Sequence, residues 1–225
     1  MADTRELLLD TAERLFAARG IDAVSLRDIT AEAEANIAAV NYHFGSKENL
    51  IREVISRRLQ PLNEERLRLL DAFAAASPSG TPSLPQVLYA LVHPVMEMMT
   101  NDPEKGTPFV RLMTSIHAGA NGCLSAAVLT DMRGTVERFI AALSAAFPGV
   151  ELREILWRAH FAIGAMAHTA SAGAMLETLS GGVCRFTSAE DLSTRLVAFL
   201  TGGFLADPAK LKIHPARRKA KGVRK

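Results

Sequence analysis

Apolar side chains recur at helical spacing along almost the whole of this chain. Residues 4–19, TRELLLDTAERLFAAR, repeat apolar positions every three to four residues and stop before Gly20, a residue that commonly ends helices. No segment of comparable length shows the two-residue alternation that is typical of a β-strand. The periodicity therefore predicts an all-α fold, built from packed helices.

Residues that favour helix N-termini divide the first part of the chain into four helices. SLRD, residues 25–28, has the form of a capping box, in which the Asp28 carboxylate accepts a hydrogen bond from the Ser25 amide. Asn36 and Ser46 are suitable N-caps for the next two helices. We therefore expect helices over about 4–19, from 25 onward, over 36–43 and over 46–76, the last with Pro61 as a kink.

A turn-rich segment, SPSGTPSLP at residues 77–85, interrupts the helical pattern after the fourth helix. Beyond it the periodicity predicts helices over about 84–100, 105–118, 123–147, 151–179 and 189–204. The predicted arrangement is a small N-terminal bundle of three helices, a connecting helix and an all-helical body.

The formal net charge of +2 conceals an asymmetry along the chain. Residues 207–225 hold 8 Lys/Arg against 1 Asp/Glu, so this tail contributes +7 and the remainder contributes −5. We expect a tail of this composition to be disordered. Such a tail could contact nucleic acid or could serve only to keep the protein soluble. The overall charge therefore does not by itself indicate a DNA-binding surface.

The sequence also limits the compartment and the chemistry. Cys123 and Cys184 have no His or Cys partner at metal-ligand spacing, which favours a reducing compartment and predicts no metal and no cofactor. The N-terminus has an acidic helical pattern rather than that of a signal peptide, and the apolar run 161–176 is too short and too polar for a membrane span. We therefore predict a cytoplasmic protein without membrane contact.

The first helices have the arrangement of a helix-turn-helix. Two short helices joined by a tight turn at residues 34–35, and backed by a longer helix, would place the second short helix in a DNA major groove. Val40, Phe44 and Ala35 fall on one face and are expected to pack inward. The residues expected to face outward are Asn36, Ile37, Ala38, Ala39, Asn41 and Tyr42.

The outward residue types suit contacts with bases and phosphates. Small side chains at 38 and 39 allow close approach to base edges, Ile37 suits a thymine methyl group and Asn41 suits adenine. Tyr42, His43 and Lys47 have the reach for phosphates, and Arg27 for a phosphate or a guanine. The complete candidate DNA-binding set is Ser25, Arg27, Asn36, Ile37, Ala38, Ala39, Asn41, Tyr42, His43 and Lys47.

The segments AERLFAARG, SLRDIT and YHFGSKENL, at their observed separations within residues 4–51, resemble the DNA-binding domain of the TetR family of bacterial transcriptional regulators. Two positions depart from the family pattern. Glu34 stands where the family usually has Gly in the turn, and we expect it to adopt an unfavourable backbone at a cost of about 1 kcal/mol. Asn41 stands where the family usually has the first of its tyrosines, so base preference should differ there.

Scattered blocks, RRLQPLNEERL, PFVRLM and ILWRAHFAIGAM, are similar to the PsrA-like group of TetR regulators, which respond to fatty acids. The resemblance implies a homodimeric regulator, most simply a repressor, released from an inverted-repeat operator by a small apolar effector of the fatty acyl class. It implies a helix-turn-helix DNA-binding domain over residues 1–48, a helical ligand-binding and dimerisation domain over 49–206, and the basic tail over 207–225.

Two parts of the expected ligand-binding domain are candidates for these roles. Residues 159–175, rich in Ala, Gly and Ser, and the apolar segment 192–205 suit a helical dimer interface, although both would also suit ordinary buried helices. Arg111 and His160 stand in apolar settings and suit an acidic head group, or internal pairing with Glu97 or Glu154. The candidate ligand-binding set is Met96, Met99, Phe109, Arg111, Met113, Ile116, Trp157, His160, Phe161 and Met166, which would equally suit plain core.

Two other functions were compared with a DNA-binding regulator. An all-helical enzyme is disfavoured because His160 and His168, though on one helical face, lack the carboxylates of a di-metal site, and neither an HExxH motif nor a Gly-rich phosphate loop occurs. A helical adaptor that binds other proteins would leave the position of Tyr42, His43 and Lys47 beside two N-caps without explanation. We therefore expect a regulator and not an enzyme.

Overall fold

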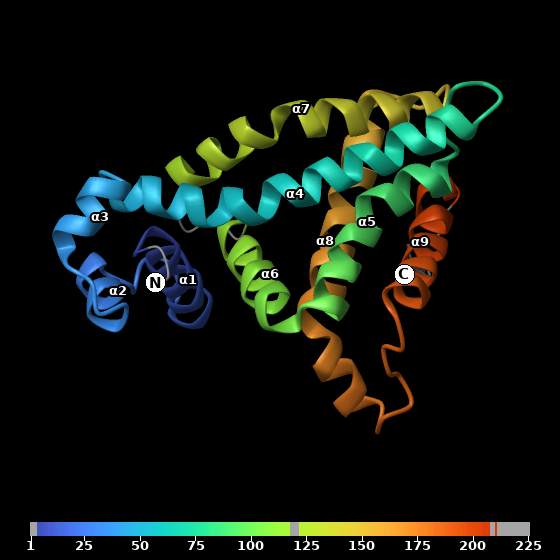
Figure 1. The fold of residues 1–225 in the computed structure, drawn as a ribbon. Coiled ribbons are helices and arrows are strands. Elements are labelled where there is room, and N and C mark those ends of the chain that lie inside the picture. The colour runs from blue at the N-terminus through green and yellow to red at the C-terminus, as the bar shows by residue number, and fades with distance from the viewer. Residues whose placement is uncertain (1–3, 118–121, 208–209, 211–225) are drawn as a thin grey trace, which may run out of the picture.

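A computed structural model describes residues 4–117, 122–207 and 210 of the chain, without the side chains at 105, 115–117, 122–129 and 174. The described residues form helices and contain no strand, which confirms the predicted all-α fold. The helices, shown in Figure 1, are α1 (Thr4–Arg19), α2 (Leu26–Glu32), α3 (Ile37–His43), α4 (Lys47–Ala76), α5 (Leu84–Asn101), α6 (Pro103–His117), α7 (Gly122–Ala146), α8 (Leu152–Leu179) and α9 (Ala189–Leu205).

Helices α1–α3 form a compact N-terminal bundle at one end of the molecule (Figure 1). Its core contains Leu8 and Phe16 from α1, Ile29 from α2 and Val40 from α3, all almost completely buried. The short helices start where the caps predict, because each cap satisfies an amide that has no partner inside the helix. The hydroxyl of Ser25 accepts from the amide of Asp28 at 3.1 Å, and the Asp28 carboxylate accepts from the Ser25 amide at 2.7 Å.

The turn between α2 and α3 contains Glu34 with a φ of +48°, in the left-handed region. The amide of the next residue, Ala35, donates to the carbonyl of Thr30 at 2.9 Å, which closes the turn. A non-glycine residue in this conformation costs about 1 kcal/mol. The unfavourable backbone expected from the sequence at this position is therefore present.

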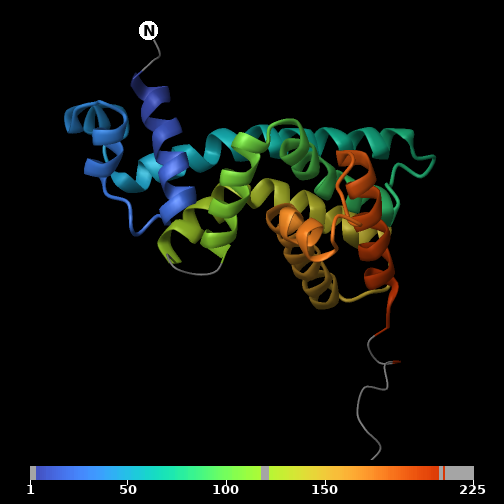
Figure 2. The same ribbon diagram turned by 90° about the horizontal axis from the view of Figure 1, so that it is seen from below.

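Helix α4 extends from the N-terminal bundle across the molecule and continues through Pro61. Helix α7 lies along α4, and α5 packs against both α4 and α9 (Figures 1 and 2). We refer to α5–α9, with the C-terminal half of α4, as the body. None of the described helices has the length and apolar character needed to cross a membrane.

The N-terminal bundle meets the rest of the molecule along α1, which packs on α4 and α6. Glu13 of α1 is only 4% exposed and faces two arginines of α4. Arg58 donates to it through Nε at 3.2 Å, and Arg57 is hydrogen-bonded to it and lies 2.8 Å from the carboxylate of Asp10. Burial opposes the charged form of Arg57, but Glu13 and Asp10 outweigh it, so the pKa of Arg57 is raised. This charge cluster fixes α1 to α4.

Candidate nucleic-acid interface

Helix α3 is held by one face and leaves the other open to solvent. Val40 and Phe44 are buried against α1 and α2, with Ala35 partly buried in the turn. On the opposite face Tyr42 is 86% exposed and Ile37 is 41% exposed. The exposed α3 face therefore combines an aromatic hydroxyl, an amide and small residues, and its members are Asn36, Ile37, Ala38, Asn41 and Tyr42.

One residue of the expected outward set lies elsewhere. Ala39 is half-buried and packs against the core of the bundle, so the expectation that it faces outward was wrong. The reason is its position: it precedes Val40, the most buried residue of α3, and in a helix of seven residues the inward face extends to it. Ala38 therefore remains the small residue on the exposed face.

The two asparagines of the α3 region have different roles. The Oδ1 atom of Asn36 accepts a hydrogen bond from the amide of Ala38 at 2.9 Å, so this side chain caps the helix. Asn41 is exposed, and its carboxamide makes no hydrogen bond with another described residue. A free carboxamide in this position can donate to and accept from the edge of one adenine.

The start of α4 is fixed by contacts with the rest of the bundle. Lys47 donates through Nζ to the backbone carbonyl of Ile21 at 2.8 Å, and Asn49 donates to the carbonyl of Phe44 at 3.0 Å. Ser46 caps the helix by accepting from the amide of Asn49 at 3.1 Å. The pKa of Glu48 is lowered because its carboxylate bonds to its own backbone amide and to Ser46. A phosphate at this helix terminus would therefore find two of the expected free amides, those of Glu48 and Asn49, already occupied.

Most basic side chains near the N-terminal bundle are neutralised within the protein. Residues 1–60 contain eight Lys/Arg, of which Arg27 and Lys47 form no ion pair with any residue that the structure describes. Arg27 is exposed at the start of α2. The six that pair with carboxylates are Arg5, Arg14, Arg19, Arg52, Arg57 and Arg58.

Comparisons with known proteins agree with this arrangement. The family model described as "Bacterial regulatory proteins, tetR family" matches residues 8–54, and the model described as "Tetracyclin repressor-like, C-terminal domain" matches residues 89–203, more than half of the chain. The chain belongs to the TetR family. It is therefore a helix-turn-helix regulator. The members of this family are transcriptional regulators and not enzymes, as expected from the sequence. TetR regulators bind DNA and act as dimers with small-molecule effectors.

A curated TetR relative is the HTH-type nicotine-responsive transcriptional repressor HdnoR of Paenarthrobacter nicotinovorans. It is 36% identical over 69 residues, which are 31% of this chain and 36% of that protein. The match therefore spans about a third of the relative's length.

Solved structures share the TetR fold over nearly their whole length. A TetR-family regulator from Bordetella parapertussis has a TM-score of 0.63 at 18% identity, covering 94% of this chain and 98% of that one. The fatty acid degradation regulator FadR from Bacillus halodurans has a TM-score of 0.62 at 12% identity, covering 88% and 98%. The ketosteroid regulator KstR2 of Mycobacterium tuberculosis has a TM-score of 0.59 at 17% identity, covering 90% and 95%. At these identities the likeness concerns the fold alone.

The body of this TetR protein separates the ligand-binding candidates into two groups. Met96, Phe109 and Met166 are buried, and Met99 and Met113 are half-buried against the core. The side chain of Ile116 lies outside the described residues. These interior residues, from α5, α6 and α8, are the part of the set that can line an internal site.

The remaining candidates are exposed. The side chains of Arg111 and His160 face solvent in the protomer, so neither lies inside the body. The ring of His160 lies beside those of Trp157 and Phe161, with its centroid 6.1 Å from each. Trp157 and Phe161 are 50% and 63% exposed, and their rings stack with centroids 5.9 Å apart. Helix α8 buries a different face, which carries Ile155, Ala162, Met166 and Ala170. Because α8 is apolar on several faces, its periodicity could not indicate which one packs inside the protomer.

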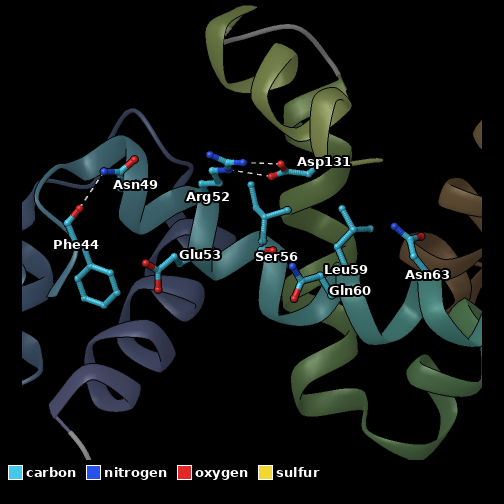
Figure 3. A pocket seen from close by; sticks show the side chains of 10 residues that line it. Phe44, Asn49, Arg52, Glu53, Ser56, Leu59, Gln60, Asn63 and Asp131 are labelled. Atoms are coloured by element: carbon cyan, nitrogen blue, oxygen red, sulfur yellow. Dashed lines mark hydrogen bonds and ion pairs between the residues drawn. The ribbon is translucent and has the colours of Figure 1, made fainter. Parts of the chain in front are cut away.

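A cavity of about 430 Å³ lies between α4 and α7, close to the N-terminal bundle (Figure 3). Arg52 of α4 spans it to Asp131 of α7 with Nε 2.9 Å and Nη2 2.5 Å from the two carboxylate oxygens. The pKa of Asp131 is lowered chiefly by this hydrogen bond. The other lining residues are Phe44, Asn49, Glu53, Ile55, Ser56, Leu59, Gln60 and Asn63.

This cavity could be predicted only in part from the sequence, through the spacing of the polar residues on α4. Polar residues from Asn49 to Asn63 recur on α4 every three or four positions and mark a polar stripe on one face. The partner across the cavity, Asp131, lies 79 residues from Arg52 in the chain, and no local pattern connects the two.

The sequence analysis also missed a buried arginine. Arg66 of α4 is 5% exposed and lies on the inward stripe that contains Leu62 and Leu70. The surrounding residues NEERL are typical of a solvated, charged helix face. The spacing indicates otherwise, because Arg66 is four residues from each of these two leucines and so lies on the same face of the helix. Its pKa is lowered to about 10 by burial.

Proposed function

We propose that this chain is a cytoplasmic, homodimeric repressor that binds a near-palindromic operator and is released from it by a small apolar effector of the fatty acyl class. The proposed units are the DNA-binding domain over residues 1–48, the ligand-binding and dimerisation domain over 49–206 and the basic tail over 207–225. The observation that carries the proposal is the exposed face of α3, with a free carboxamide at Asn41 and Tyr42 extending into solvent. A second helix of this kind, supported from behind by a longer helix, suits the major groove.

A dimer is supported by the apolar surface that α8 and α9 leave uncovered. The rings of Trp157 and Phe161 and the side chain of Phe199 are at least half exposed in the protomer. Exposed apolar surface of this extent favours association, and a second copy with the same two helices would bury it in a four-helix interface. Further exposed members of this surface are Leu152, Leu156, Ile163, Met175 and Leu205.

The proposed operator contacts follow from the exposed side chains. Asn41 and Ile37 read base edges, with Ala38 allowing close approach, while Tyr42, His43, Arg27 and Lys47 contact phosphates or guanine. Ser25 and Asn36 act mainly as caps that position these helices. Two α3 helices about 34–36 Å apart would enter successive major grooves of an inverted repeat.

Release by ligand is proposed to act through the contacts between α1, α4 and α6. Helix α6 carries buried Phe109 and half-buried Met113 and packs on α1. A ligand in the body that moves α6 or α4 would move α1 with it, since Glu13 fixes α1 to α4. The two α3 helices of a dimer would then lose their spacing. The ligand has this effect only to the extent that it binds the released state more tightly.

Selection from a random double-stranded DNA pool at near-physiological salt tests this function. The purified full chain should enrich an inverted repeat whose half-site centres are about one helical turn, or a multiple of it, apart. Asn41→Ala should change the enriched base at one position of each half-site, whereas Asn101→Ala, an exposed asparagine of α5, should leave the repeat unchanged. Retention without an enriched repeat would contradict the proposal and return attention to the basic tail or to a protein-binding adaptor.

A further inference from the structure

Arg66 is a buried cation at the point where three helices of the body meet. It belongs to α4, and its Nε donates to the backbone carbonyl of Leu91 on α5 at 3.0 Å. Its Nη1 donates to Oδ1 of Asn63 at 3.1 Å, and its Nη2 lies 3.8 Å from the sulfur of Met166 on α8. The guanidinium therefore lies inside the body, away from the DNA-binding face.

The acceptors around this guanidinium are all neutral. No carboxylate among the described residues forms an ion pair with Arg66, and burial is the cause that lowers its pKa. Charges are rarely buried unless they are paired, because leaving water costs several kcal/mol per ion. A guanidinium has five N–H donors, and three are directed at neighbours here, one of them at a weakly accepting sulfur. The side chain thus has unused donors and lacks a counter-charge.

Asn63 connects this guanidinium to the cavity between α4 and α7. Asn63 lines that cavity and is also the residue whose Oδ1 accepts from Arg66. Figure 3 shows Asn63 at the end of the row of α4 side chains that is farthest from Phe44. The Asn63 amide therefore separates the arginine, which does not itself line the cavity, from the cavity. Phe44 and Asn49 lie at the opposite end of the row, and the ion pair of Arg52 with Asp131 lies between the two ends.

We propose that Arg66 binds the acidic group of the effector, a carboxylate carried on an apolar body. This inference rests on the proposed function, because it names the chemistry of the ligand that the body would bind. A carboxylate can accept two parallel hydrogen bonds from one guanidinium and supplies the counter-charge that none of the described residues provides. The acidic group of the ligand then takes the place of the Asn63 amide, and this displacement is transmitted along the helix that leads to α3.

A structural role for Arg66 is the competing explanation. Leu91 lies three residues before Pro94, which interrupts the hydrogen-bonding pattern of α5, and the Nε–H of Arg66 satisfies a carbonyl in this region. A purely structural role requires no acid. It predicts that loss of Arg66 lowers stability and that the protein has no preference for acidic ligands over neutral ones.

The test compares straight-chain carboxylates from octanoate to hexadecanoate with the primary alcohols of equal chain length, by calorimetry on the full-length protein. We expect the acid that binds best to bind about 10- to 100-fold more tightly than its alcohol, as for hydrogen bonds to a charged group. Arg66→Met should abolish this preference and bind acid and alcohol equally. Arg66→Lys should retain part of it.

Arg68→Met is the matched control, because Arg68 lies on the same helix with its guanidinium exposed and paired with Glu65. It should keep the full preference for the acid. Equal binding of acids and alcohols by the wild-type protein, no binding of any acid, or an unchanged preference in Arg66→Met would overturn the proposal. If Arg66→Met does not fold, the wild-type comparison and Arg66→Lys still decide. Operator selection without ligand tests the proposed function separately, so the two failures are distinguishable.

Discussion

Buried charges have oppositely charged partners where the N-terminal bundle meets α4, but not inside the described part of the body. Where the bundle meets α4, the buried carboxylate of Glu13 faces two arginines, Arg57 and Arg58, and the charges balance within the protein. In the body, buried Arg66 faces a carbonyl, an amide oxygen and a sulfur. The first arrangement holds two parts of the molecule together, whereas the second leaves a charge for something else to neutralise.

The same contrast occurs on the surface of the bundle. Six of the eight basic residues within residues 1–60 are paired with acids, which leaves Arg27 and Lys47 for phosphates. Unpaired charges therefore occur both where DNA is proposed to bind and where the effector is proposed to bind. Charges that form no ion pair with a described carboxylate are therefore the informative ones in this molecule.

The largest effect is expected from breaking the balanced cluster. Glu13→Gln leaves two arginines facing a neutral group, and breaking a buried pair in this way costs about 3–5 kcal/mol of the free energy of unfolding. Glu53→Gln is the control, since Glu53 and its partner Arg5 are both partly open to solvent and surface pairs contribute about 0–1 kcal/mol. Urea unfolding of both variants measures the difference. Equal losses would mean that the cluster does not hold α1 to α4.

The next effect concerns the charges and amides that face DNA. Asn41→Ala should cost about 1–3 kcal/mol of discrimination at one base pair per half-site, because it removes a bidentate contact.

Lys47→Ala should instead weaken binding to all sequences and reduce the slope of log affinity against log salt by about 1 per phosphate contact. Fluorescence anisotropy on the selected operator and on a scrambled duplex measures both. A loss of sequence preference in Lys47→Ala alone would reverse the assigned roles.

A smaller effect is expected when the unbalanced charge is removed. Arg66→Met should change the free energy of unfolding of the ligand-free protein by no more than about 1 kcal/mol. Relief of a buried, uncompensated cation offsets the loss of hydrogen bonds to Leu91 and Asn63. Thermal and urea unfolding measure the change. A loss as large as that of Glu13→Gln would indicate that Arg66 is a structural group after all.

The smallest effect is expected at the ion pair across the cavity. Arg52 lowers the pKa of Asp131 below the ordinary value of 3.8, so this pair stabilises the folded state above that pH and is lost as the pH falls through the lowered pKa. Because both side chains are substantially exposed, the contribution is less than about 1 kcal/mol. Asp131→Asn should therefore be slightly less stable than wild type at pH 7 and equally stable near pH 2. A constant difference over this range would contradict the assignment.

Local chemistry explains why the N-terminal bundle could be predicted closely from the sequence. Ser25, Asn36 and Ser46 define helix starts through hydrogen bonds to amides two or three residues away, and these caps are present as expected. The positive φ of Glu34 followed from the family pattern in the same local way.

The body could be predicted only in its helices, because burial there depends on distant segments. The exposure of His160 and Phe161 depends on which face of α8 the other helices cover. Arg66 lies in the charged run NEERL, which is typical of a solvated face, but α5 and α8 cover it. Its significance comes from the absence of an acid partner among the described residues, which no local pattern encodes.

Ligand and operator should each weaken the binding of the other to the dimer, and measuring both effects tests this coupling most directly. The affinity for the best-binding carboxylate should be measured on the free dimer and on the dimer saturated with the selected operator. Thermodynamic linkage requires that the operator weaken carboxylate binding by the same factor by which the carboxylate weakens operator binding. We predict a factor of about 5–150, the usual range for coupled sites. The same carboxylate affinity with and without operator would contradict the account.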